Sequence, residues 1–203
     1  MNRARVRNSS SVCVPQYPIP ARNPPTSWYR NGARLPEGSK LSLLAWGTLT
    51  LQNASTGAVK CKTVAGVQVE NPSGGGAGKG TLLGVASYGC VAPACESAGG
   101  KAEMAPEKLP WSSVLIEEAA LFRDKLEGIG LRAICAAREQ SVLFHGSLRP
   151  EAANGFLIGA APSKLEFGAG SGSLESTVGA GELSGKMKLM GYDAEQLTQV
   201  RNP

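Results

Sequence analysis

The feature that most constrains this sequence is an alternation of apolar and polar residues with a period of two, repeated in short stretches. It is clearest at 41–51, where apolar residues occupy positions 41, 43, 45, 49 and 51. A period of two places such residues on one face of a β-strand. Similar stretches, separated by turn residues at spacings of roughly 8 to 12, are 59–62, 65–70, 81–90, 129–135, 141–148, 155–158, 164–167, 173–178, 182–190 and 196–200.

This pattern predicts an all-β chain, an antiparallel β-sandwich or barrel of about ten short strands. The 26 Gly and 13 Pro among 203 residues favour many turns and disfavour long helices. Residues 1–27 are rich in Pro, Arg and Ser without a periodic apolar pattern, and we expect a disordered basic arm there. The single all-β domain is expected over 28–203, beginning with a hairpin that turns at Asn31-Gly32.

Two segments are less regular. Residues 112–127 contain good helix formers such as Glu117, Glu118 and Ala119, and local propensity slightly favours an amphipathic helix over two strands joined near Glu117. Residues 91–110 are rich in Ala, Pro and Gly, and an irregular connection is expected there.

The distribution of charged and apolar residues indicates which kinds of partner to expect. The net charge of +5 owes much to Arg3, Arg5 and Arg7, so the rest of the chain is nearly balanced and predicts no nucleic-acid partner. No stretch approaches the roughly 20 apolar residues of a transmembrane helix. The basic start lacks the apolar run of a complete signal peptide, so a different natural start or another export route is our hypothesis.

The five cysteines, at 13, 61, 90, 95 and 135, have no spacing suited to zinc. Two disulfides among Cys61, Cys90, Cys95 and Cys135 are expected, and four cysteines allow three connectivities. We favour Cys61 with Cys90 and Cys95 with Cys135, because the first pair closes a loop between neighbouring strand candidates. Disulfides predict an extracellular or cell-envelope location, with a cytoplasmic one as the alternative.

The sequence contains no complete motif for catalysis or phosphate binding. The string 74–81 resembles a phosphate-binding loop, but Ser73 and Gly80 stand where that motif requires Gly and Ser or Thr. His145, the only histidine, is expected to be an exposed strand residue. A pair of carboxylates drawn from Glu166, Glu175 and Glu182 would suit glycoside hydrolysis, although alternating strands more simply place all three in solvent. No catalytic residue, metal or cofactor is predicted.

Four strings carry a resemblance: 46–51, 69–78, Leu109-Pro110-Trp111 and 185–192. With them the chain resembles uncharacterised, mostly exported proteins of high-GC Gram-positive bacteria, over about residues 28–200. The resemblance implies a β-rich domain with paired cysteines at the four positions above and a β-hairpin at 112–127. It implies no activity, and this chain departs from it in lacking a visible signal peptide.

The function expected is that of a non-enzymatic secreted or cell-surface protein, structural or ligand-binding, whose loops 71–80 and 91–110 meet an envelope glycan or a surface protein. The candidate binding residues in or beside these loops are Asn71, Gly75, Lys79 and Trp111. An envelope polysaccharide hydrolase using paired carboxylates is the alternative, and nucleotide binding at 74–81 is a third hypothesis.

Overall fold

The computed structural model describes residues 26–30, 33–118, 121–153 and 164–191. Strands take up most of this part of the chain. They are β1 (Tyr29–Arg30), β2 (Ala33–Arg34), β3 (Lys40–Asn53), β4 (Gly57–Glu70), β5 (Lys79–Val91), β6 (Ala102–Pro106), β7 (Trp111–Glu118), β8 (Leu121–Cys135), β9 (Gln140–Leu148), β10 (Glu151–Ala153), β11 (Lys164–Phe167), β12 (Ser173–Leu174) and β13 (Gly181–Gly191). The helical pieces are α1 (Pro93–Glu96) and the 3₁₀ turn η1 (Ala136–Arg138).

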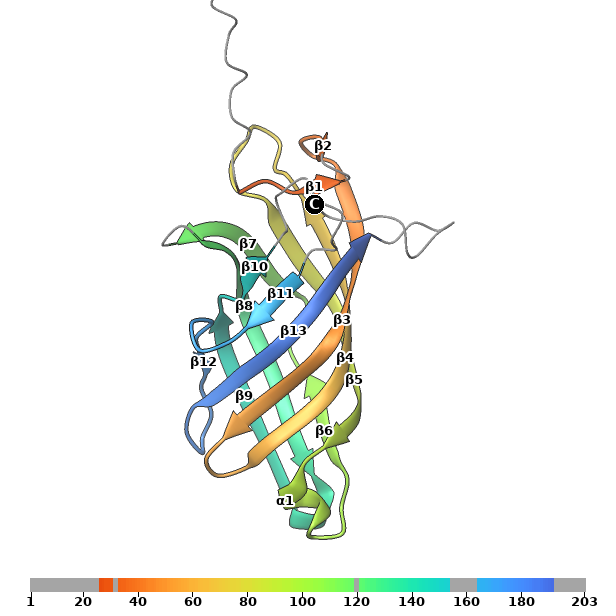
Figure 1. Cartoon of the computed structure of the whole chain (residues 1–203), viewed down its shortest axis with the longest axis vertical. Helices are drawn as coiled ribbons and strands as arrows, with labels where there is room; N and C mark the ends of the chain where they lie inside the picture. The colour runs from red at the N-terminus through yellow and green to blue at the C-terminus, as the bar shows by residue number, and fades with distance from the viewer. Residues whose placement is uncertain (1–25, 31–32, 119–120, 154–163, 192–203) are drawn as a thin grey trace, which may run out of the picture.

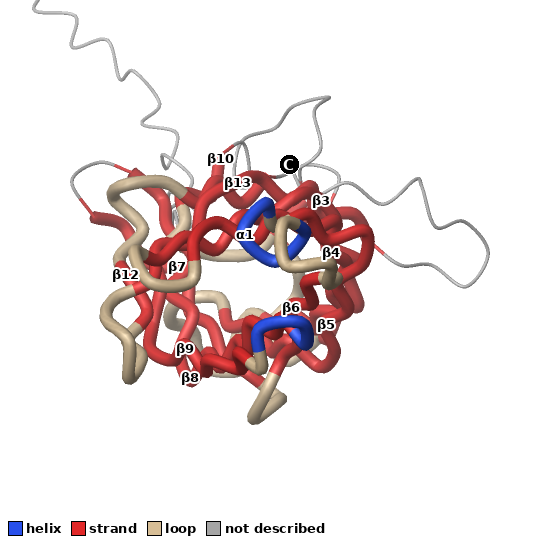
Figure 2. Tube along the Cα trace, turned by 90° about the horizontal axis from the view of Figure 1, so that it is seen from below, coloured by secondary structure: helices blue, strands red, loops and turns tan. Residues whose placement is uncertain are grey.

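Eight of these strands close into an antiparallel barrel, in the order β10-β11-β13-β3-β4-β5-β7-β8 and back to β10. The closing pair is Glu151 of β10 with Arg123 of β8. Figure 1 shows the tilted strands β13, β3 and β4 side by side, and Figure 2, seen along the barrel, shows the strands as a ring. The predicted all-β antiparallel class is therefore confirmed, as a barrel.

The alternation in the sequence becomes the inside and the outside of this barrel. In β4, residues at odd positions from Val59 to Val69 are buried, whereas their even neighbours are exposed or half-buried. The same parity buries Leu41, Leu43 and Leu51 of β3. Apolar side chains from all the long strands thus fill the interior of the barrel.

The two ends of the barrel are closed differently. At the upper end in Figure 1, the hairpin β1–β2 covers the interior and buries Trp28 and Leu35. At the lower end, a disulfide between Cys95 and Cys135 joins α1 to the end of β8. One end is therefore held by packing and hydrogen bonds and the other by a covalent bond.

Some expectations need correction. Residues 112–118 pair with 121–127 as the antiparallel strands β7 and β8, so the helix that local propensity favoured is wrong. Residues 91–110 are not an irregular connection throughout, since they contain α1 and β6. β12 ends at Leu174, short of the expected 178. Four expected features lie outside the described residues: residues 1–25 of the arm expected at 1–27, the turn at Asn31-Gly32, and the strands at 155–158 and 196–200. The last two residues of that arm are described, and Ser27 is buried.

Candidate functional site

The barrel interior encloses a cavity of about 40 Å³. Its lining is apolar except for Thr63, and it comprises Leu49, Thr63, Ala65, Leu82, Val85, Met104, Trp111, Leu126, Ile129, Leu131, Phe167, Leu183 and Met187. An apolar cavity of this kind stays dry and favours apolar guests. Because the volume is below the 300 Å³ or so of ordinary ligand pockets, only a small guest fits, or one that displaces flexible side chains such as Met104 and Met187.

A groove opens in the barrel wall between β5 and β6. β5 pairs with β7 only over Lys79–Leu82, and β6 pairs with β8. Over the rest of its length, β5 faces β6 without a backbone ladder between these two fully described strands. The groove has a volume of about 430 Å³ and is lined by residues 86–90 and 102–106, which include both outward-facing and inward-facing side chains.

Met104 separates this groove from the interior cavity. It lines both of them and is only 3% exposed. Its long, unbranched side chain has more rotational freedom than Leu or Ile. Met104 is therefore the side chain that the groove and the cavity share.

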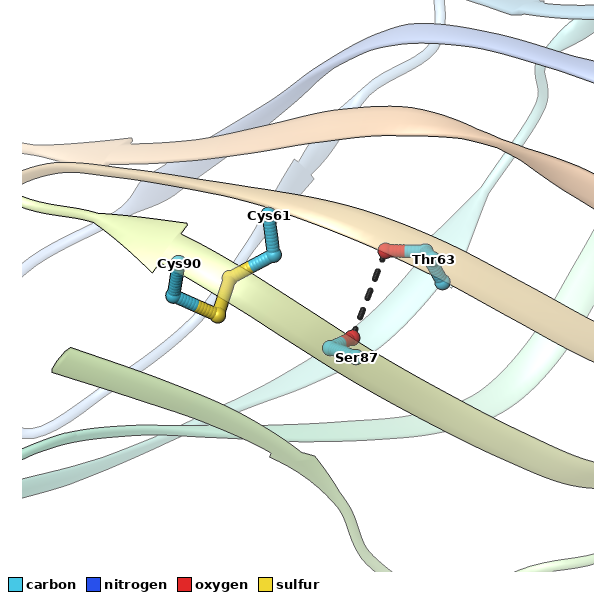
Figure 3. Close-up of a disulfide and its surroundings, with 4 residues drawn as sticks. All are labelled: Cys61, Thr63, Ser87 and Cys90. Atoms are coloured by element: carbon cyan, nitrogen blue, oxygen red, sulfur yellow. Dashed lines mark hydrogen bonds between the residues drawn. A yellow bond between two sulfur atoms is a disulfide. The ribbon is translucent and has the colours of Figure 1, made fainter.

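Beside the groove, β4 and β5 are linked by a disulfide and by a side-chain hydrogen bond. A disulfide joins Cys61 to Cys90, whose Cα atoms lie 4.1 Å apart. Close by, the hydroxyls of Thr63 and Ser87 are 3.3 Å apart and share a hydrogen bond (Figure 3). These links tie β5 to β4 and not to β6, so they hold one side of the groove in place.

Next to the cavity lies a polar pair, Ser113 of β7 and Asp124 of β8. Both side chains are at least 95% buried, and Ser113 Oγ and Asp124 Oδ1 make no hydrogen bond in the described part of the chain. Burial raises the pKa of Asp124 to about 6, and the nearby Ser113 hydroxyl opposes that rise. The hydroxyl is thus close enough to affect the carboxyl, but the two atoms do not reach hydrogen-bond geometry.

Of the four candidate binding residues, only Gly75 lies in a turn, where it is half-buried. Asn71 is completely buried, and Trp111 begins β7 and lines the cavity. Lys79 begins β5, and its carbonyl accepts a hydrogen bond from Trp28 Nε1 at 3.0 Å. Gly75 lies in the turn at 73–75 with a φ of +88°. The expectation of an exposed binding loop is therefore corrected for Asn71 and Trp111, which serve the barrel interior and its closure.

The carboxylates proposed for hydrolysis lie on the outer side of the barrel. Glu166 alternates with the buried Leu165 and Phe167 and forms an ion pair with Lys186 at 3.1 Å. Glu175 and Glu182 are exposed, as is His145, whose backbone pairs with that of Glu175. None of these side chains lines the cavity, and this arrangement gives the hydrolase alternative no support.

Sequence reasoning missed Met104, Ser113 and Asp124. Met104 fell in a segment interpreted as irregular. Ser113 and Asp124 fell in the segment whose helix and hairpin interpretations stayed open, and a helix gives no two-residue parity. Read as strands, the parity of Trp111 and Leu115 would have placed Ser113 inside, and that of Leu126 would have placed Asp124 inside.

The closed antiparallel barrel defines the structural class of the protein. No family model and no curated protein sequence matches the chain. Among solved structures, the structure of this chain is similar to that of DynF, a protein from the dynemicin biosynthesis pathway of Micromonospora chersina, with a TM-score of 0.51 and 12% sequence identity. The match covers 85% of this chain and 87% of that one. At this identity the similarity concerns the fold alone.

Within the described residues, no helix has the length and apolar character needed to cross a membrane. The same residues contain no cluster of three or more His, Cys, Asp or Glu side chains that could hold a metal ion.

Proposed function

We propose that this protein is a non-enzymatic binding protein whose barrel interior takes up a small, largely apolar molecule. The observation that carries the proposal is the apolar cavity inside the barrel, whose lining residue Met104 also lines an open groove in the barrel wall. Eight-stranded barrels have an interior just wide enough to be filled by side chains or to hold one small ligand. Here the filling is incomplete.

The interior also has the means to adjust its volume. Met104 of β6 and Met187 of β13 both line the cavity. Methionine repacks around a guest more easily than branched residues do. Trp111 provides an aromatic face in the same lining, and its indole NH is already bonded to the carbonyl of Glu107 at 2.8 Å. Its ring is therefore available for apolar contacts without an unsatisfied donor.

The test uses N-phenyl-1-naphthylamine, a neutral probe that fluoresces in apolar surroundings. Because this probe is larger than the cavity, its binding also requires flexible lining side chains such as Met104 and Met187 to move aside. We expect saturable binding to the wild-type protein and loss of at least about tenfold in affinity for Ala65→Val, which fills part of the cavity. The matched control is Val64→Ile, which adds one carbon on the outer face of the same strand. Absence of saturable binding, or equal loss in both variants, would contradict interior binding.

We further propose that the protein works outside the cytoplasm, in a bacterial envelope or medium. Two disulfides support this location, because such bonds persist in oxidising compartments and are rare in the cytosol. The resemblance to exported proteins of high-GC Gram-positive bacteria points the same way. Mass spectrometry of the natively expressed, alkylated and unreduced protein tests it, and free thiols at these four positions would overturn it.

A further inference from the structure

We propose that Asp124 and Ser113 bind the ammonium group of a small apolar amine, whose hydrocarbon part occupies the barrel cavity. This inference rests on the proposed function and names the chemical class of the ligand. It comes from two buried polar side chains, 3% and 5% exposed, that point into a largely apolar barrel and whose atoms Asp124 Oδ1 and Ser113 Oγ make no hydrogen bond within the described residues.

The pair lies one layer of side chains away from the cavity. Asp124 is two residues from Leu126, and Ser113 is two residues from Trp111, and both of these neighbours line the cavity. Ser113 is also the cross-strand partner of Leu126. Residues two apart in a strand point to the same face and lie roughly 7 Å apart. A short alkyl chain covers that distance between a polar head at Asp124 and the cavity.

Among the residues that the structure describes, no Lys, Arg or His forms an ion pair with the buried carboxyl of Asp124. Its neighbour Arg123 faces the other side of the strand and donates hydrogen bonds to the carbonyls of Arg149, at 2.9 Å, and Gly170, at 3.2 Å. Burial raises the pKa of Asp124, and the nearby Ser113 hydroxyl lowers it. A carboxylate taken out of water without a partner is strongly unfavourable, and a bound cation that donates hydrogen bonds removes that cost.

Ser113 has room for its hydroxyl beside Gly80 and can contribute a hydrogen-bond acceptor to the ammonium group. A side chain at Gly80, across the β5–β7 ladder, would lie 2.3 Å from Ser113 Oγ, so the absence of one at Gly80 makes room for the hydroxyl. An ammonium group has three donors and no acceptor. The ionised carboxyl and the lone pairs of the Ser113 hydroxyl can accept hydrogen bonds from the ammonium group, whereas an ionised carboxylic acid ligand would bring a second negative charge.

The experiment compares hexylammonium, 1-hexanol and hexanoate at pH 7.5, with binding followed by the NMR signal of the Trp111 indole NH. These probes share a chain and differ in the head group. We expect hexylammonium to bind at least about tenfold more tightly than 1-hexanol, as for a charge-assisted hydrogen bond, and hexanoate more weakly than both. In Asp124→Asn the preference for the amine should disappear while 1-hexanol still binds.

Glu117→Gln, an exposed carboxylate on the neighbouring strand, is the control and should leave the preference intact. Ser113→Ala, with Asp124 unchanged, should weaken hexylammonium by a smaller factor. Equal binding of the three probes, or a preference that survives Asp124→Asn, would overturn this inference while leaving interior binding in place. Failure of both N-phenyl-1-naphthylamine and 1-hexanol to bind would instead remove the proposed function itself.

Discussion

At the scale of single residues, Asn71 and Asp124 are both buried polar side chains, but they differ in whether their polar atoms have hydrogen-bond partners. Asn71 accepts a hydrogen bond from the backbone NH of Trp28 at 2.7 Å. It also donates to the carbonyls of Trp28, at 2.9 Å, and Leu35, at 2.8 Å. Asp124 Oδ1 has no such partner. The first residue therefore stabilises the closed end of the barrel, and the second destabilises the unliganded barrel at neutral pH.

Asp124 should make stability depend on pH. Its pKa is raised from 3.8 to about 6 in the folded protein, so the folded state holds a proton that the unfolded state releases. Its contribution is fully present below about pH 4 and is lost as pH rises through about 6. We expect Asp124→Asn to raise the free energy of unfolding at pH 7.5 by up to about 3 kcal/mol, with no gain at pH 4. Urea unfolding at both values measures this, and an equal effect at both would contradict it.

Asn71→Ala should destabilise the closed end. The substitution leaves one backbone NH and two carbonyls without their partners in a fully buried position. We expect a loss of roughly 2–5 kcal/mol in the free energy of unfolding. Gln68→Ala, on the outward face of β4, which ends at Glu70 just before Asn71, is the control and should cost little. A cost for Asn71→Ala no larger than that of the control would show that the closure does not depend on these bonds.

At the scale of elements, the barrel depends on a very close approach of β3 and β13. A Cβ at Gly47 would lie 1.9 Å from the carbonyl oxygen of Lys186, and one at Gly185 would lie 2.1 Å from that of Thr48. Gly185 also has a φ of +133°, which side chains disfavour. Glycine at both positions is therefore a requirement of the pairing between the two strands.

Gly47→Ala should weaken this pairing, because a backbone atom and not a flexible side chain stands in the way. We expect a destabilisation of roughly 2–4 kcal/mol, measured by thermal or urea unfolding. The matched control is Gly84→Ala in β5, where an added Cβ meets nothing within 4 Å. If both substitutions have the same effect, the close approach does not limit stability.

Met104 should control the passage between the groove and the cavity. Shortening it to Ala removes the one side chain that lines both spaces, so N-phenyl-1-naphthylamine should associate several-fold faster in stopped-flow measurements. Met104→Leu keeps a similar volume and should change the rate less. Circular dichroism confirms that each variant is folded, because core truncation costs about 2–5 kcal/mol. Equal association rates in the two variants would place the entrance elsewhere.

At the scale of the whole molecule, two disulfides link residues 29 and 40 positions apart. Loops of these lengths predict a stabilisation of about 3–4 kcal/mol each, with little difference between them. Their positions differ more, since Cys95–Cys135 fastens α1 to the end of β8 whereas Cys61–Cys90 joins neighbouring strands.

Removing each disulfide separately should reveal that difference. Cys95→Ala with Cys135→Ala should expose residues 96–101 to limited proteolysis, because these residues are mostly at the surface and lose their covalent anchor. Cys61→Ala with Cys90→Ala should lower the unfolding midpoint similarly without new cleavage there. Identical cleavage patterns for the two variants would contradict a local role for the first bond.

The sequence by itself determined the class of fold. The pleat of a strand turns every second side chain to the same face, so the alternations at 41–51 and 65–70 were sufficient to predict β3 and β4. The structure also has the cysteine pairing that the order of strand candidates favoured. These inferences needed only local order along the chain.

Tertiary structure decided the features that carry the proposed function. Ring closure through Glu151 and Arg123, the groove between β5 and β6, and the inward position of Asp124 depend on which strands meet and in what register. Local propensity at 112–127 favoured a helix, and only pairing with neighbouring strands makes that segment a hairpin. The physical reason is that periodicity tells which residues share a face, whereas contacts between distant segments decide which face is enclosed.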